Sequence, residues 1–173
     1  MRPGLLLLAL GLCLALTPPT SFASEFTLYL VRHAEKQDDG SRDPALTAEG
    51  QQRADKLAAW LEDKSIENVW SSDFQRTRDT ALPTAGKLGL GLNLYDPLKH
   101  PVLIRNLLGQ RHTALVVGHS NTIPKLARML CECEIADMDE DEYDRLIVIT
   151  GNGDQVQAET LNQTTLFEPA SKE

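Results

Sequence analysis

Residues 28–36 constrain this chain more than any other stretch, because an apolar run turns abruptly into charge within them. Residues 28–31 have the β-favouring composition of a buried strand. Arg32 and His33 follow at once. Ligands bind at the carboxyl ends of strands in open α/β sheets, so we expect these two side chains at such an edge. A neutral imidazole there can attack phosphorus while a guanidinium grips the phosphate oxygens.

A second apolar run, residues 113–118, predicts another buried strand of the parallel type. It leads into His119, and a helix is predicted over 123–131. The carboxyl ends of parallel strands share one edge of a sheet. We therefore expect His119 to lie close to His33.

An arginine at a predicted helix start adds a third basic group. A short strand is predicted over 66–70 and a helix over 74–88, with Arg76 in its first turn. Helix N-termini that follow strands attract anions, and a guanidinium adds a full positive charge there. Arg78 lies on the opposite side of the same helix and is expected outside the site.

The rest of the chain predicts one domain over 24–168, followed by a disordered tail over 169–173, because no repeat or linker interrupts it. We expect His100 and His112 at the surface. The other predicted elements are a helix over 46–61 capped by Thr47, an edge strand or extended connection over 92–97, a helix over 99–109, a hairpin of strands 146–150 and 156–161, and a polar, frayed segment from Asn162.

The N-terminus has the pattern of a secretory signal peptide over 1–23. Arg2 precedes an apolar run over 5–16, and the small residues Ser21 and Ala23 suit cleavage after Ala23. The run is short for a membrane span, although a retained anchor is the alternative. We expect a secreted or periplasmic protein.

Charge and cysteine spacing bear on partners. The formal net charge of −8, without a basic patch, disfavours nucleic acid as a partner. The acidic stretch 137–144 is expected to be a solvated loop.

Cys131 and Cys133 point to different faces of a helix, so we expect free, partly buried thiols, with a disulfide as the alternative. Their surroundings do not form a zinc pattern.

Four blocks carry a resemblance to a known family. They are Leu-Val-Arg-His-Ala-Glu-Lys at 30–36, Asp-Pro-Ala-Leu-Thr-Ala-Glu-Gly-Gln-Gln-Arg-Ala at 43–54, Ser-Ser-Asp-Phe-Gln-Arg-Thr-Arg-Asp-Thr-Ala at 71–81, and Val-Gly-His-Ser-Asn-Thr-Ile-Pro at 117–124. In this order the chain resembles a short, exported branch of the histidine phosphatase superfamily, the phosphoglycerate mutase-like group. The resemblance implies a three-layer α/β/α sandwich with a mostly parallel central sheet.

The resemblance also implies roles for single residues. His33 would attack phosphorus and form a phosphohistidine, with its other ring nitrogen held by a backbone carbonyl. No metal and no organic cofactor are implied. The substrate-binding residues that it implies are Arg32, Arg76, His119, Ser120 and Asn121.

The acid that would protonate the leaving oxygen is the open point of the resemblance. Asp96 is the first candidate, because it follows the expected third strand. Glu35 is the second, and its alternative role is to hold a lysine or arginine near the pocket. Without a positioned acid, good leaving groups such as a phosphoramidate nitrogen or an acidic alcohol would be favoured.

We expect an exported, metal-independent phosphatase that acts on phosphomonoesters or phosphoramidates. Its substrate could be an envelope sugar phosphate, another small organic phosphate or a phosphoprotein. Short connections leave no room for the cap that a mutase needs, so a mutase or phosphotransferase is the lesser alternative. A catalytically weak phosphate-binding sensor or adaptor of the same fold is the other.

Overall fold

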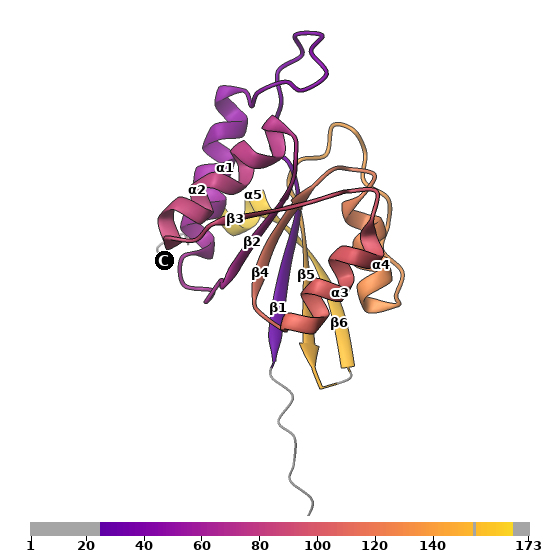
Figure 1. The fold of residues 1–173 in the computed structure, drawn as a ribbon. Coiled ribbons are helices and arrows are strands. Elements are labelled where there is room, and N and C mark those ends of the chain that lie inside the picture. The colour runs from indigo at the N-terminus through magenta and orange to yellow at the C-terminus, as the bar shows by residue number, and fades with distance from the viewer. Residues whose placement is uncertain (1–24, 154, 168–173) are drawn as a thin grey trace, which may run out of the picture.

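A six-stranded sheet runs through the molecule, with helices on both of its faces (Figure 1). The computed structural model describes residues 25–153 and 155–167. The predicted signal peptide and the predicted tail over 169–173 lie outside these residues. The elements are β1 (Phe26–Arg32), α1 (Ala48–Leu61), β2 (Asn68–Ser72), α2 (Gln75–Leu88), β3 (Leu92–Tyr95), α3 (His100–Gln110), β4 (Ala114–Gly118), α4 (Ile123–Cys131), β5 (Arg145–Asn152), β6 (Gln155–Asn162) and α5 (Gln163–Phe167).

The strand order is β3-β2-β4-β1-β5-β6. The pairs β3–β2, β2–β4 and β4–β1 are parallel, whereas β1–β5 and β5–β6 are antiparallel. The expected α/β sandwich with a mostly parallel sheet is therefore confirmed. Because β1 and β4 are parallel neighbours near the centre, the residues that follow them emerge side by side at one edge.

The core lies on both faces of this sheet, because side chains alternate along each strand. Leu28 and Leu30 of β1 belong to the cluster that α3 and α4 cover, while Tyr29 and Val31 belong to the cluster that α1 and α2 cover. Figure 1 shows these helix pairs on opposite sides of the sheet. Burying each large apolar side chain contributes about 1.5–3 kcal/mol to stability.

The start of α1 is tied to the segment that follows β1. Thr47 caps the helix as predicted, and its side chain accepts a hydrogen bond from the Gly50 N–H at 3.1 Å. A Cβ added at Gly50 would lie 2.2 Å from the backbone oxygen of Glu35. Only glycine therefore lets α1 approach the segment after His33 so closely.

Two expectations for peripheral residues are wrong. The segment after Asn162 does not fray but forms α5, because the buried Gln163 side chain donates to the carbonyl oxygens of Tyr143 and Arg145 at 3.3 and 3.2 Å. His100 is not a surface residue but is buried, because the start of α3 faces the turn before α4. Its ring hydrogen-bonds the backbone of Thr122 there.

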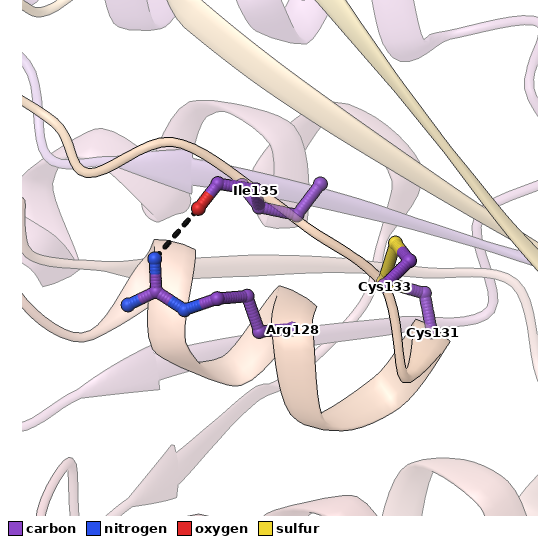
Figure 2. The surroundings of a disulfide bond; sticks show 4 residues. All are labelled: Arg128, Cys131, Cys133 and Ile135. Atoms are coloured by element: carbon purple, nitrogen blue, oxygen red, sulfur yellow. Dashed lines mark hydrogen bonds between the residues drawn. A yellow bond between two sulfur atoms is a disulfide. The ribbon is translucent and has the colours of Figure 1, made fainter.

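The expectation of free thiols is also wrong, because Cys131 and Cys133 form a disulfide (Figure 2). The helix ends at Cys131, and Glu132 adopts a left-handed conformation with φ 51°. The chain therefore reverses, and the two Cα atoms come within 5.1 Å. Figure 2 also shows Arg128 donating to the Ile135 carbonyl, at 2.6 Å, so the segment leaving α4 is fastened twice.

No helix in the described part of the chain is long and apolar enough to cross a membrane.

Candidate active site

Two buried strands deliver one histidine each to the same edge of the sheet. Arg32 ends β1 and His33 follows it, while His119 follows β4. The ring centroids of the two histidines lie 5.6 Å apart. His33 and Arg32 are only 3% and 2% exposed. The structure thus brings together the groups that the strand pattern placed at this edge.

His33 is held in a defined orientation. Its backbone N–H donates to the Gly118 carbonyl at 2.9 Å, and its Nδ1 lies 2.8 Å from the Ala34 carbonyl oxygen. A carbonyl can only accept, so Nδ1 carries the proton and Nε2 keeps its lone pair. Burial, assisted by the charges of Arg32 and Arg76, lowers the pKa of His33 to about 3. At neutral pH the ring is oriented and uncharged, with the lone pair of Nε2 available.

Arg32 is clamped by the acidic segment 137–144. Its Nη1 donates to the carbonyl oxygens of Asp139 and Glu142 at 2.9 and 3.0 Å, and its Nη2 lies 3.4 Å from a carboxylate oxygen of Glu140. The guanidinium carbon stands 4.1 Å from the centre of the Tyr143 ring. The acidic segment is an exposed loop, as expected, and its backbone additionally packs over a buried charge and supplies its carbonyl acceptors.

Arg76 reaches the site from the first turn of α2. Its guanidinium carbon lies 4.6 Å from the centre of the Phe74 ring, and its Nη1 lies 3.5 Å from a carboxylate oxygen of Asp43. Arg78 instead pairs with Asp73 outside the site. The helical spacing therefore separates the two arginines as expected.

His119 completes the group. Its backbone N–H donates to the Thr122 hydroxyl at 3.0 Å, and the Phe74 ring meets its ring edge-on, with centroids 5.0 Å apart. Burial and the nearby charges of Arg76 and Arg32 lower the pKa of His119 to about 4. The neutral ring retains one N–H that can donate to a ligand.

Three buried nitrogen atoms of this group lack a hydrogen-bond partner among the described residues: Arg32 Nε, Arg76 Nε and His119 Nε2. Buried polar atoms in proteins are nearly always paired, and leaving one unpaired costs about 1–3 kcal/mol. Two of the three belong to permanent cations. Their arrangement around a neutral nucleophile is that of a site for a tetrahedral oxyanion.

The two candidate acids are each bound to a partner other than the histidines and Arg76. Glu35 is bound by Arg53 through contacts of 2.5, 2.8 and 3.0 Å, which is its alternative predicted role. Asp96 follows β3, at the far edge of the sheet, and accepts from the Leu98 N–H at 2.9 Å. That bond and then Lys99 hold the pKa of Asp96 below its usual range. Both carboxyls are tied to other partners.

The two remaining candidates differ in their surroundings. Ser120 is buried and donates to a carboxylate oxygen of Glu140 at 2.6 Å, so it helps to hold the acidic loop. Asn121 is exposed at the turn before α4. Within residues 25–153 and 155–167, no three histidine, cysteine, aspartate or glutamate side chains are grouped so that they could hold a metal ion.

Sequence reasoning missed the residues that surround the arginines. Phe74 and Tyr143 supply aromatic faces, and Asp43 and Glu140 supply carboxylates. Phe74 stands at the end of β2 in the same block as Arg76, which was a usable signal. Nothing in the sequence indicated Glu140, because its position depends on how the loop after α4 folds back.

Comparisons with known proteins agree with this geometry. The family model described as histidine phosphatase superfamily (branch 1) matches residues 28–100. A probable phosphoglycerate mutase GpmB of Escherichia fergusonii is 40% identical over 76 residues, which cover 40% of this chain and 35% of that protein. The probable phosphoglycerate mutase GpmB of Escherichia coli O139:H28 is 35% identical over 91 residues, which cover 49% of this chain and 41% of that protein. The match thus spans less than half of these relatives' length.

Solved structures resemble nearly the whole described fold. The protein histidine phosphatase SixA in complex with tungstate superimposes with a TM-score of 0.68 at 20% identity, covering 82% of this chain and 99% of that one. The native mycobacterial glucosyl-3-phosphoglycerate phosphatase Rv2419c gives 0.64 at 15% identity, covering 80% and 98%. At these identities the likeness establishes the fold.

Proposed function

We propose that the chain is a member of the histidine phosphatase superfamily, whose branch 1 model matches residues 28–100, and that it cleaves phosphomonoesters or phosphoramidates through a phosphohistidine on His33. The observation that carries this proposal is the neutral His33 ring among three unpartnered buried nitrogen atoms. The ring supplies the lone pair, and the surrounding donors supply the field that a phosphoryl group needs.

The first chemical step follows from the orientation of the ring. His33 Nε2 forms a bond to phosphorus as the bond from phosphorus to the leaving atom breaks, and that atom departs with the bonding electrons. The imidazole becomes cationic because Nδ1 keeps its proton. The Ala34 carbonyl, 2.8 Å away, accepts a stronger hydrogen bond from the charged ring.

The second step returns the enzyme to its starting state. Water forms a bond to phosphorus, the Nε2–phosphorus bond breaks, and the water proton passes to phosphate or solvent. In both steps Arg32, Arg76 and His119 stabilise charge on the equatorial phosphoryl oxygens. No other group needs to change its covalent state.

Transfer to an acceptor other than water is the alternative, since the matched curated relatives are named as probable mutases. A mutase must hold its intermediate away from water, and three of the connections that follow strands at this edge are short. Residues 73–74 join β2 to α2, 96–99 join β3 to α3 and 119–122 join β4 to α4. The geometry therefore favours hydrolysis.

The test is hydrolysis of para-nitrophenyl phosphate by the purified protein, with and without a chelator. We expect turnover that resists the chelator and that His33→Ala reduces by at least about 10³-fold. His112→Ala is the matched control, because His112 is an exposed histidine far from this edge. Full activity in His33→Ala would refute the nucleophile. Phosphate transfer from para-nitrophenyl phosphate to an added alcohol in place of water would favour the phosphotransferase.

We further propose that the protein is exported, on the support of the residue pattern over 1–23. Mass spectrometry of the protein recovered from its host is expected to find an N-terminus near Ser24. An intact N-terminus in the membrane fraction would contradict this proposal.

A further inference from the structure

A second feature adjoins the candidate site at the same edge of the sheet. The carboxyl ends of β2 and β3 border a hollow with a volume of about 420 Å³. Its walls are Asp73, Phe74, Leu94, Tyr95, Asp96 and Pro97. None of its members takes part in the chemistry proposed above.

Phe74 joins this hollow to the site. Its ring contacts the His119 ring, with centroids 5.0 Å apart, and it lies under the Arg76 guanidinium at 4.6 Å. The same side chain is a wall of the hollow. Paired strands lie about 4.8 Å apart, so the hollow begins about 5–10 Å from His119. A group attached to a phosphate bound at His119 and Arg76 reaches it directly.

The walls of the hollow are mostly apolar, and each of its two carboxylates is paired with a cation. Leu94, one of its walls, is 52% exposed. The two carboxylates are bound elsewhere, because Asp73 pairs with Arg78 and Asp96 with Lys99. A neutral, apolar group loses little by entering such a hollow and gains by leaving water.

The opposite flank of the site does not suit a neutral, apolar group. There a hollow of about 330 Å³ is walled by Glu35, Glu49, Arg53, Asp141, Tyr143 and Asp144. The one cation of that set, Arg53, is bound by Glu35. This flank repels an anionic leaving group and offers no apolar surface beyond the Tyr143 ring.

The leaving group must also depart without help from a positioned acid, because Asp96 and Glu35 are bound to other partners. A phenol has a pKa of about 10, whereas water, like simple alcohols, lies near 16. An aryl oxygen therefore departs as its anion far more readily than an alkyl oxygen does. The flat ring that carries it is also the group that suits an apolar hollow beside Phe74.

We propose that the hollow between β2 and β3 receives the leaving group of the substrate, and that the preferred substrates are aryl phosphates, phosphomonoesters of a flat apolar ring. The proposal rests on the phosphatase function of His33. It places the phosphoryl group among Arg32, Arg76 and His119, with the ring lying over Phe74 and against Leu94.

Binding of phosphonates, which cannot be hydrolysed, tests the hollow apart from leaving-group chemistry. Benzylphosphonate and methylphosphonate are measured as competitive inhibitors of acetyl phosphate hydrolysis. We expect the wild type to bind benzylphosphonate at least about tenfold more tightly, because its ring buries apolar surface. In Leu94→Glu this ratio should fall below about threefold.

Leu82→Glu is the matched control, because Leu82 is 49% exposed but lies on α2, outside the hollow. It should keep the wild-type ratio. If thermal melting shows that Leu94→Glu does not fold, Leu94→Ser is measured in its place. An equal affinity for both phosphonates, or a ratio that Leu94 variants leave unchanged, overturns the assignment of the hollow.

A second measurement separates this inference from the function on which it rests. The wild type is expected to have a higher kcat/KM for phenyl phosphate than for phosphoethanolamine, whose alkyl leaving group is cationic. Failure to hydrolyse even acetyl phosphate would refute the phosphatase function itself. Hydrolysis of acetyl phosphate with a preference for phosphoethanolamine would refute only the aryl assignment and would direct the leaving group to the acidic flank.

Discussion

The β3 side of the candidate site is open and apolar, whereas the β5 side is covered by an acidic loop. On the β3 side Phe74 leads into a hollow walled by Leu94 and Pro97. On the β5 side the loop places Glu140 and Tyr143 against Arg32. The two flanks share one anion site but present different chemistry to whatever is attached to the anion. Under the proposed function, the flanks would select the substrate and the centre would carry out the chemistry.

The two flanks also differ in the contacts that hold them in place. The acidic loop is tied by Arg32, by the disulfide at the end of α4 and by Arg128. The β3 flank is the edge of the sheet, with β2 as its one neighbouring strand. The loop therefore has its position set by several independent contacts, whereas the β3 flank borders the apolar hollow.

The largest expected effect is at the centre that both flanks share. Arg76→Ala should lower kcat/KM by about 10²–10³-fold, because it removes a charged donor to the developing phosphoryl charge. Arg78→Ala, which removes the same group from the same helix outside the site, should change kcat/KM by less than about threefold. Steady-state kinetics with para-nitrophenyl phosphate measures both. Equal losses of kcat/KM in the two variants would show that the arginines of α2 act only through the overall positive charge of the helix.

The next effect concerns two glycines of α1 and α2. Gly50→Ala should lower the free energy of unfolding by at least about 1–3 kcal/mol, since the added Cβ would collide with the Glu35 backbone. Gly86→Ala should raise it by roughly 0.5–1 kcal/mol, because nothing lies within 4 Å of that position and alanine favours the helix. Urea denaturation measures both changes. Similar changes in the unfolding free energy of the two variants would show that Gly50 does not pack tightly against the Glu35 backbone.

A pH effect tests the electrostatics of the centre. The pKa of His33 is about 3 in the folded protein and near 6.5 in the unfolded chain, so the unfolded chain binds the extra proton between these values. His33 thus lowers the stability progressively as the pH falls from 6.5 to 3. We expect the melting temperature to decrease less between pH 7 and 4 in His33→Ala than in the wild type or His112→Ala.

The same pKa predicts that activity will not fall as the pH is lowered through about 6.5, where an ordinary imidazole becomes protonated. The reactive neutral form of His33 persists down to about pH 4. The kcat/KM profile of para-nitrophenyl phosphate should therefore show no loss near pH 6.5 attributable to His33. A loss there that His112→Ala leaves in place would indicate a solvated His33.

The smallest expected effect belongs to the acidic flank. Glu140→Gln should strengthen inhibition by inorganic phosphate by at most about fivefold, because the carboxylate that competes with the anion for Arg32 is 83% exposed and its attraction to the guanidinium is screened by water. Glu134→Gln, at an exposed position on the same segment, is the control. Weaker phosphate inhibition in Glu140→Gln would mean that the carboxylate mainly orders the loop.

Much of the framework was predictable because it depends on local pattern. The helix over 123–131 has the expected bounds, and the buried strands that end at Arg32 and before His119 were visible as apolar runs. Parallel strands end at one edge, so the approach of His33 to His119 followed from two local patterns and one general rule.

The errors arose where the path of the backbone or the packing of another helix decides the surroundings of a residue. Cys133 meets Cys131 because the chain reverses at Glu132, and His100 is buried because α4 packs beside α3. The proposal of Asp96 as the acid stays a prediction, and the structure adds that its oxygens are bound by Leu98 and Lys99. None of these contacts has a signature in the residues on either side of the position.

The sequence by itself determined the alternation of strands and helices, the residues at the carboxyl edge of the sheet and the resemblance to the histidine phosphatase superfamily. These depend on short-range periodicity, composition and block order. The tertiary structure alone decided the protonation of His33, the clamp on Arg32 and the apolar hollow beside Phe74. Burial, charge and shape at a site arise from segments that are far apart in the chain, and only folding brings them together.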